Sequence, residues 1–302
     1  MYDVAIIGGG PAGLAAGLYG ARSNLKVLII ERGLPGGQMQ NTLDIENYPG
    51  FKHILGPDLS AHMHQQTVEL GVEWKTGEVT GVQLEGQPKV LQVGSEEVQA
   101  KAVIIASGAL PKYLEVPGEK EFQGRGVSYC ATCDGAFFKG KHVFVVGGGD
   151  SAVEEGMFLT QYAAKVSVLV RRDTLKAQPY LQERAFKNPK MEFVWNTVVE
   201  EILGEGKVTG VRVRNTVDGT TEVLEGDGVF VYIGFYPNST FLQGTGVLND
   251  SGYVITDAKM ATAIPGVFAA GDVRDTPMRQ IVTASADGAV AAMSAFEYIQ
   301  SL

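Results

Sequence analysis

Short apolar runs, glycine-rich turns and Ala-rich helical stretches alternate along this chain. The first apolar run, residues 3–7, predicts a buried parallel strand, and a helix to about residue 22 and a strand over 26–30 follow it. The same order returns later, with strands predicted over 141–146 and 166–170 on either side of a helix that ends near residue 162. Strand–helix–strand units build parallel sheets, so the pattern predicts an α/β fold that contains this unit twice.

The remaining segments predict a β-rich extension to each unit and two linkers. Alternation over 73–99 indicates a small antiparallel sheet, and residues 192–233 are mostly strand-like. Pro and Gly gather at 110–118 and again at 236–246, which indicates two crossings between domains. Further elements are expected as a helix over 58–70, a strand over 102–106, a strand and turn over 266–273 and a final helix over 279–299.

Composition and charge narrow the class of protein. The chain has 302 residues, which is enough for two domains, and 45% of them are hydrophobic. A formal charge of −9 argues against nucleic acid and against anionic membranes as partners. No apolar run approaches the ~20 residues of a membrane span, and the first residues lead directly into a strand, so we expect no membrane segment and no signal peptide. Two cysteines, both in one C-x-x-C pair, fit a reducing compartment, and the expected location is cytoplasmic.

The first glycine loop is a dinucleotide-binding fingerprint of the form G-x-G-x-x-G. It stands between a strand and a helix, where glycines let backbone N–H groups approach a pyrophosphate and the helix N-terminus favours its charge. An acid at the end of the next strand is placed to bond a ribose hydroxyl. The residues expected at this site are Gly8, Gly10, Pro11, Ala12, Gly13 and Glu31.

A second fingerprint follows the strand at 141–146, with alanine as its last small residue. Where the first unit ends its second strand in an acid, this one ends in Arg171 and Arg172. A guanidinium binds a 2′-phosphate that a carboxylate would repel, so this site is predicted to take NADP(H); the alternative is two solvated arginines at a strand end. The fingerprint residues expected to bind are Gly147, Gly149, Asp150, Ser151 and Ala152.

The only two cysteines, Cys130 and Cys133, stand two apart with Asp134 directly behind them. Such a pair holds two sulfurs within bonding reach, and the thiolate of such a pair attacks disulfides. A zinc half-site and an inert thiol pair are the alternatives, but zinc needs two further ligands and the chain has only four histidines. The pattern therefore favours a redox dithiol, and we expect no metal.

Together these motifs resemble the low-molecular-weight thioredoxin reductases over essentially the whole chain. The most specific stretches are 130–134 (CATCD), 147–155 (GGGDSAVEE) and 265–273 (PGVFAAGDV). The resemblance implies a discontinuous FAD domain at 1–114 and 242–302, an inserted NADPH domain at 115–241 that carries the dithiol, a homodimer, and thioredoxin as the protein substrate. It also implies that the flavin cofactor is contacted by Gly37, Gln38, Asn47, Gly271, Asp272, Arg279, Gln280 and Ile281.

The stretch expected at the 2′-phosphate departs from the family pattern. The family usually has His-Arg-Arg there and another Arg five positions on, whereas this chain has Val170 before the two arginines and Lys176 at the later place. Two arginines and a lysine can still hold a phosphate, although lysine offers a point charge and not a fork.

The order of motifs bears on mechanism. The dithiol precedes the second fingerprint, and no histidine lies beyond His142, so Asp134 is the expected proton donor unless it is only a turn or capping residue. By resemblance, Cys133 should face the flavin. Alternatives with the same chemistry are a reductase of low-molecular-weight disulfides, a dithiol oxidase and a ferredoxin-fed reductase; a non-catalytic flavoprotein that senses NADPH is an alternative of another class.

Overall fold

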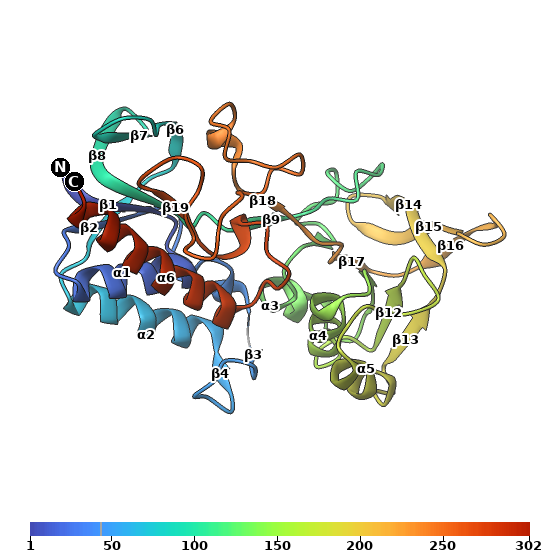
Figure 1. Cartoon of the computed structure of the whole chain (residues 1–302). Coiled ribbons are helices and arrows are strands. Elements are labelled where there is room, and N and C mark those ends of the chain that lie inside the picture. Colours follow the sequence, from blue (N-terminus) through green and yellow to red (C-terminus); the bar gives the residue numbers. More distant parts are fainter. Residues whose placement is uncertain (43) are drawn as a thin grey trace. The chain divides into compact units, whose positions relative to one another are not determined.

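The chain folds into two compact units. The computed structural model describes residues 1–42 and 44–302, and the side chains of residues 44, 132 and 133 also lie outside the described part. Unit 1 consists of Met1–Leu110 and Tyr236–Leu302, and unit 2 of Pro111–Phe235. Figure 1 labels many of the helices and strands of both units. The ligand-binding domains 1–114, 115–241 and 242–302 stay a prediction, because the two units are defined by packing alone.

Unit 1 is built on a seven-stranded mixed sheet in the order β5-β2-β1-β8-β7-β6, with β19 also paired to β8. The apolar run at the start of the chain forms β1, which pairs in parallel with β2 on one side and β8 on the other. One edge of β8 pairs in antiparallel fashion with β7 at its start and in parallel with β19 at its end. The strands are β1 (Tyr2–Ile7), β2 (Val27–Glu31), β5 (Glu73–Thr76), β6 (Val79–Gln83), β7 (Lys89–Val93), β8 (Glu96–Ile105) and β19 (Val267–Ala269).

The segment at 73–99 differs from the expected separate antiparallel sheet. Its first strand, β5, pairs in parallel with β2 and so belongs to the main sheet. The expected strand at 102–106 is the second half of β8, whose first half pairs with β7. Alternation of polar and apolar residues reports that a strand has one buried face, and it does not report which strand lies beside it.

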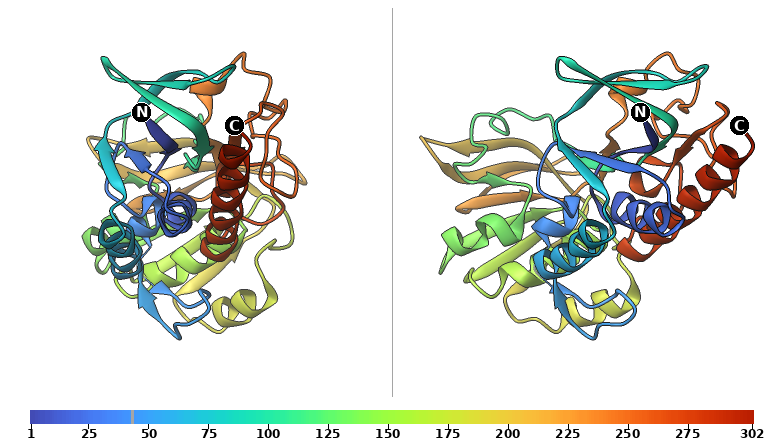
Figure 2. Two further views of the ribbon diagram at one scale, coloured as in Figure 1. Left: turned by 60° about the vertical axis from the view of Figure 1, so that its left-hand side comes forward. Right: turned by 90° about the vertical axis from the view of Figure 1, so that its left-hand side faces the viewer.

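Helices cover the unit 1 sheet, and two of them that pack side by side come from distant parts of the chain. Helix α1 (Pro11–Arg22) packs along α6 (Ile281–Gln300), as Figure 2 shows. The contact is close, because a Cβ on Gly288 would lie 2.1 Å from the carbonyl oxygen of Ala12. Helix α2 (Gly56–Glu69) begins two residues before the predicted start, with Pro57 in its first turn. The shorter elements are η1 (Gly37–Asn41), β3 (Asp44–Ile45), β4 (Ile54–Leu55), β9 (Ala109–Pro111), β18 (Phe235–Pro237), η3 (Thr240–Leu242) and η4 (Gly271–Val273).

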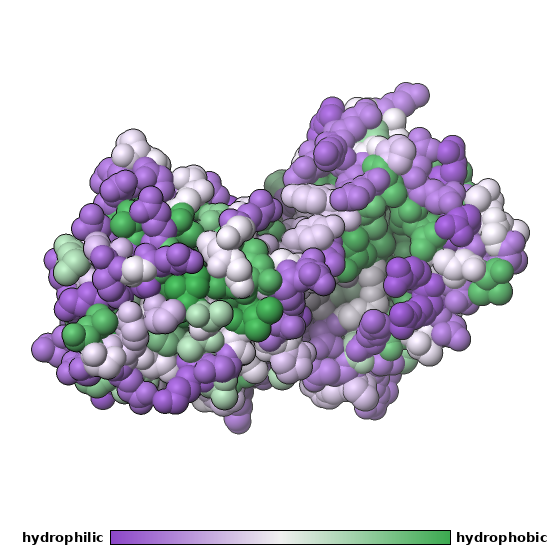
Figure 3. Space-filling model, turned by 45° about the horizontal axis from the view of Figure 1, so that its top comes forward, coloured by the Kyte–Doolittle hydropathy of each residue, from purple (hydrophilic) through white to green (hydrophobic). Residues whose placement is uncertain are grey.

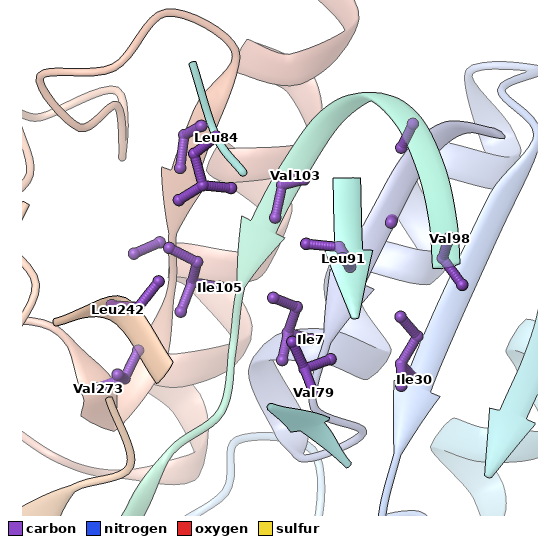
Figure 4. Close-up of a cluster of buried hydrophobic side chains, with 14 of the residues drawn as sticks. Ile7, Ile30, Val79, Leu84, Leu91, Val98, Val103, Ile105, Leu242 and Val273 are labelled. Atoms are coloured by element: carbon purple, nitrogen blue, oxygen red, sulfur yellow. The ribbon is translucent and has the colours of Figure 1, made fainter. Parts of the chain in front are cut away.

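A core of aliphatic side chains fills the space on the other face of the unit 1 sheet. Figure 4 shows Ile7 and Ile30 of the parallel strands facing Val79 and Leu91 of the antiparallel extension. Leu242, from the second segment of unit 1, is fully buried in the same cluster. The β-rich extension thus serves to cover apolar strands that would otherwise face water.

Unit 2 repeats the design with a five-stranded parallel sheet in the order β10-β17-β11-β12-β13. A three-stranded antiparallel sheet, β14-β15-β16, extends it. The strands are β10 (Val127–Ser128), β11 (His142–Val146), β12 (Lys165–Leu169), β13 (Met191–Val194), β14 (Thr197–Gly204), β15 (Val208–Asn215), β16 (Thr221–Glu225) and β17 (Gly228–Val231). The helices are α3 (Ala131–Asp134), η2 (Gly135–Phe138), α4 (Asp150–Leu159) and α5 (Pro179–Phe186).

Two helices of unit 2 differ from the sequence expectation. Helix α4 ends at Leu159, whereas the pattern predicted an end near residue 162, and its last turn is closed by the N–H of Thr160. Helix α5 was not predicted; it has a proline in its first turn and only two buried residues, Leu181 and Ala185, which is a weak periodic signal.

No helix in the described part of the chain is long and apolar enough to cross a bilayer. On the face shown in Figure 3, hydrophilic side chains predominate and apolar ones gather in limited patches.

Candidate functional site

The first glycine loop has the geometry of a phosphate cradle. Gly8 has a φ of +107° and donates its N–H to the carbonyl of Ile30 at 2.8 Å. A Cβ on Gly8 would lie 2.3 Å from the oxygen of Ala106, and one on Gly13 would lie 1.9 Å from the oxygen of Gly8. The turn and the close approach of helix to strand therefore require glycine at both positions. Gly10 is the residue before the helix, and Pro11 and Ala12 open α1.

Glu31 ends β2 directly beside this loop. One carboxylate oxygen accepts the N–H of Gly9 at 2.6 Å and the other accepts the N–H of Gly33 at 2.7 Å. These bonds fix the carboxylate against the loop, and each oxygen keeps a further lone pair. The carboxylate is thus fixed beside the loop, and each of its oxygens can accept one further hydrogen bond.

Several residues that the family resemblance implies as flavin contacts come together in unit 1. The Cα of Gly10 would lie 3.1 Å from a Cβ on Gly37, so η1 begins against the first glycine loop. The side chain of Gln38 donates to the carbonyl of Ala109 at 3.2 Å. Asn47 donates to the side chain of Gln280 at 3.0 Å, which joins residues 233 apart in sequence.

The C-terminal Gly-Asp turn also reaches the first glycine loop. A Cβ on Gly271 would lie 2.9 Å from the Cβ of Ala12, and the Gly271 N–H donates to Asp287. Burial raises the pKa of the next residue, Asp272, while the guanidinium of Arg279 opposes that rise.

Arg279 and its neighbours complete this part of unit 1. The guanidinium of Arg279 lies over the ring of Tyr253, 4.5 Å from its centre, and its Nε is buried with no hydrogen-bond partner among the described residues. Gln280 caps α6, which starts at Ile281. A buried N–H without an acceptor is costly in a folded protein, so this atom points to a ligand that would accept its bond.

The second glycine loop repeats the cradle in unit 2. Gly147 has a φ of +146°, and a Cβ there would lie 2.2 Å from the carbonyl oxygen of Tyr232. Ala152 is fully buried beneath the loop. No described atom lies within 4 Å of a Cβ placed on Gly149, so the backbone before α4 is open on that side. An open backbone at a helix start is what a pyrophosphate needs.

The three cationic side chains predicted for the 2′-phosphate project from the segment that follows β12. Arg171, Arg172 and Lys176 are all exposed, and none has a side-chain hydrogen bond or ion pair within the described part of the chain. Their backbone is held: the N–H of Lys176 donates to the oxygen of Gly148 at 2.7 Å, and the oxygen of Arg172 accepts from Asn196. These cations are therefore placed beside the second glycine loop with their charges available.

Two fingerprint residues in α4 differ in their surroundings. Ser151 is exposed at the start of the helix. Asp150, by contrast, already accepts two hydrogen bonds from Gln178.

The cysteine pair lies between β10 and η2, in the same unit as the second glycine loop. Cys130 is half-buried and disulfide-bonded, and its N–H donates to the hydroxyl of Ser128 at 3.1 Å. Cys133 belongs to α3, but its side chain lies outside the described residues. The half-buried Asp134 closes the turn by donating its N–H to the oxygen of Cys130.

Sequence reasoning missed two residues beside this turn. The Tyr232 hydroxyl accepts the N–H of Ala131, inside the cysteine motif, at 2.8 Å. Burial first, then the charge of Glu155 and to a lesser extent that of Asp134, raises the pKa of this tyrosine.

Glu155 itself lies on α4, which packs against α3. One of its oxygens is buried without a partner among the described residues, and burial, with a smaller effect of Glu154, raises its pKa to about 7. A signal for Glu155 existed, because it stands at helical spacing between the buried Ala152 and Leu159. Tyr232 offered none, since it is 101 residues from its partner.

Comparison with known proteins finds similar sequences and structures along the whole chain. The pattern of the pyridine nucleotide-disulphide oxidoreductase family matches residues 2–288. The thioredoxin reductase of Bacillus subtilis is 54% identical over 100% of this chain and 96% of its own length. A crystal structure of Lactococcus lactis thioredoxin reductase is 48% identical, covers 100% of both chains and superposes with a TM-score of 0.99. The thioredoxin reductase structure from Streptococcus pyogenes, 50% identical over 100% of this chain and 99% of its own, gives a TM-score of 0.68.

Proposed function

This chain belongs to the pyridine nucleotide-disulphide oxidoreductase family, and on that premise we propose that it is an NADPH-dependent flavoprotein that reduces the disulfide of thioredoxin. Its cofactors are FAD and NADPH. The observation that carries the proposal is the disulfide-bonded Cys130 within a C-x-x-C turn, in the unit that also holds the second glycine loop. A redox dithiol and a nicotinamide site on one unit are the parts that a disulfide reductase needs.

The residues of unit 1 fit FAD. Gly8 and Gly13 form a cradle that a Cβ would fill, Glu31 is oriented for a ribose, and the orphaned Nε of Arg279 requires an acceptor. When bound, FAD supplies the two-electron chemistry that connects a nicotinamide with a disulfide. The protein residues bind the pyrophosphate, orient the adenosine and offer Arg279 to the cofactor.

The residues of unit 2 fit NADPH. The open backbone at Gly149 would face the pyrophosphate, and the exposed Arg171 and Arg172 would pair with the 2′-phosphate. Lys176 adds a third positive charge, so the phosphate is recognised although the site has one guanidinium fewer than is usual in the family.

The dithiol carries the electrons to the protein substrate by thiol–disulfide exchange. A thiolate of the reduced pair attacks one sulfur of the thioredoxin disulfide; the mixed disulfide is then resolved by the second thiol, which restores the Cys130–Cys133 disulfide and releases reduced thioredoxin. Over the cycle, NADPH and one proton are consumed for each disulfide reduced. We assign the delivery of that proton to Asp134, which stands directly behind the pair.

The finer attributes of the protein belong to the same proposal. We propose a cytoplasmic location, because a chain whose only cysteines form one C-x-x-C pair fits a reducing compartment. We also propose a homodimer, because dimers are usual in the family that the chain resembles.

A coupled assay tests the proposal. The purified holoprotein is mixed with NADPH, thioredoxin and a chromogenic disulfide, and we expect rapid colour only when thioredoxin is present. Oxygen uptake with added dithiols would instead identify a dithiol oxidase, and turnover driven by reduced ferredoxin without NADPH would identify a ferredoxin-fed reductase. A protein that binds flavin and NADPH but is inert in every mixture would overturn the catalytic assignment.

A further inference from the structure

The segment that carries the 2′-phosphate cations is tied to the second glycine loop by a second set of contacts. Asp150 is the first residue of α4, and one of its oxygens accepts the backbone N–H of Gln178 at 2.7 Å. Its other oxygen accepts the side-chain amide of Gln178 at 2.8 Å. We call this two-bond contact the Asp150–Gln178 clasp.

The clasp explains why an acid stands in a loop that binds phosphate. A carboxylate at a helix start that points at a pyrophosphate would repel it. Here each carboxylate oxygen of Asp150 accepts a hydrogen bond from Gln178, so two donors that lie outside the glycine loop stabilise its negative charge. Asp150, counted from the sequence among the nucleotide-binding residues, is thus engaged with the protein.

Gln178 lies in the same segment as the cationic side chains, so the Asp150–Gln178 clasp can fix the position of that segment. Lys176 lies two residues before it, and the N–H groups of Lys176 and Ala177 both donate to the oxygen of Gly148, at 2.7 and 3.1 Å. The segment from the end of β12 to the start of α5 is therefore closed at its far end by Gly148 and Asp150 together. The side chains of Arg171, Arg172 and Lys176 are exposed and make no hydrogen bond or ion pair of their own in the described structure, so the backbone of the segment sets where these cations lie. Besides the clasp, two side chains hold that backbone: the Thr216 hydroxyl donates to the carbonyl of Arg171 at 3.2 Å, and the Gln182 amide donates to the carbonyl of Ala177 at 2.6 Å.

We propose that Asp150 is a positioning residue for nucleotide selectivity: through Gln178 it holds the segment of Arg171, Arg172 and Lys176 where these cations meet the 2′-phosphate of NADPH. The inference rests on the proposed NADPH site and goes beyond it. Because the clasp acts only through cations that contact the 2′-phosphate, its loss weakens binding of nucleotides that carry this phosphate and spares those that lack it.

The proposal is tested with substitutions that add a carboxylate at position 178, remove the one at position 150, or do both. Gln178→Glu places two carboxylates face to face and opens the clasp. Asp150→Asn leaves it closed, because the Gln178 amide can rotate and accept from the new amide while the backbone bond is kept. The double variant D150N/Q178E restores a carboxylate–amide pair with the original net charge. Glu183→Gln is the matched control, since Glu183 lies on α5, is exposed and pairs with Lys187.

The measurement is binding of NADP⁺ and NAD⁺ to each holoprotein by calorimetry, which does not depend on turnover. We expect Q178E to weaken NADP⁺ binding at least about tenfold, which corresponds to about 1.4 kcal/mol, and to change NAD⁺ binding less than about twofold. D150N, E183Q and the double variant should stay within about threefold of the parent for NADP⁺.

Each other outcome contradicts the proposal in a recognisable way. Equal losses for both nucleotides in D150N would mean that Asp150 touches a part that they share. If the double variant binds NADP⁺ as weakly as Q178E does, the carboxylate at position 178 itself repels the phosphate and the clasp has no role. If Q178E binds NADP⁺ as tightly as the parent, the Asp150–Gln178 contact does not affect nucleotide binding. If the parent protein itself binds NAD⁺ as tightly as NADP⁺, the NADPH assignment fails, and the role of the clasp fails with it.

Discussion

Replacing Glu155 by glutamine should make unit 2 more stable at alkaline pH and leave it nearly unchanged at acidic pH. Glu155 lies on α4 with one buried oxygen that has no partner among the described residues, and burial raises its pKa from 4.5 to about 7. A difference of this size, at 1.36 kcal/mol for each pKa unit, corresponds to about 3 kcal/mol. Glutamine has nearly the shape of the protonated acid and cannot ionise.

The sign follows from which form the folded protein prefers. The folded state holds the Glu155 proton up to about pH 7, whereas the unfolded chain releases it near 4.5. The stability contributed by the Glu155 proton is therefore complete below pH 4.5, is lost as the pH rises from 4.5 through about 7, and does not fall further above that pH. The glutamine variant lacks that loss, so the difference in unfolding free energy between E155Q and the parent should grow from less than about 1 kcal/mol at pH 5 to about 3 kcal/mol at pH 8.

Denaturant unfolding of the FAD-loaded protein at pH 5, 6, 7 and 8 measures this difference. Glu183→Gln, an exposed change on α5, serves as control and should show no trend with pH. Glu154→Gln removes the smaller of the two causes that raise the pKa of Glu155. When E155Q is compared with its parent in this E154Q background, the difference in unfolding free energy should still grow with pH, but less steeply. A difference between E155Q and the parent that is flat from pH 5 to pH 8 would refute the reasoning.

Three further changes test the proposed chemistry. Replacing Arg171 and Arg172 by alanine removes charge-assisted bonds worth roughly 1.5–3 kcal/mol each. In steady-state kinetics, kcat/KM for NADPH should therefore fall at least ~100-fold, while kcat/KM for NADH stays nearly unchanged. Equal losses with both nucleotides would show that the arginines do not bind the 2′-phosphate. Cys133→Ser should abolish thioredoxin reduction but keep flavin absorbance and its bleaching by NADPH, and a variant that still reduces thioredoxin would exclude the dithiol as the carrier. Tyr232→Phe leaves the Ala131 N–H unpaired, at a cost of ~1–3 kcal/mol, and we expect faster hydrogen exchange at that amide; unchanged exchange would mean that the bond is dispensable.

Elements set by local chemistry could be predicted from the sequence. The apolar runs before both glycine loops form β1 and β11, and the helices predicted after the loops form as α1 and α4. Both glycine loops stand between a strand and a helix as predicted, and Gly8 and Gly147 each have a positive φ that glycine adopts readily. In these places the residue type and its neighbours decide the conformation, so a short window is sufficient.

Contacts between distant residues could not be predicted. The pairing of β5 with β2 depends on the whole sheet, and the bond of Tyr232 to Ala131 joins the end of β17 to the cysteine turn. The sequence placed Asp150 in a glycine fingerprint, but only the path of the chain after β12 brings Gln178 to its carboxylate. Periodicity describes which face of an element is buried, and the partner on that face is decided by the fold.

The close packing of α6 on α1 also bears on how the chain is made. Unit 2 is one continuous stretch, so all of its strands are available as soon as residue 235 has left the ribosome. The helix of the first glycine loop must wait for Gly288 and the rest of α6, which follow unit 2 in the chain and are synthesised after it. Because domains fold as units during synthesis, the inserted unit should complete its folding while the N-terminal segment of unit 1 still lacks its final partner, and chaperones would meet the exposed face of α1 during that interval.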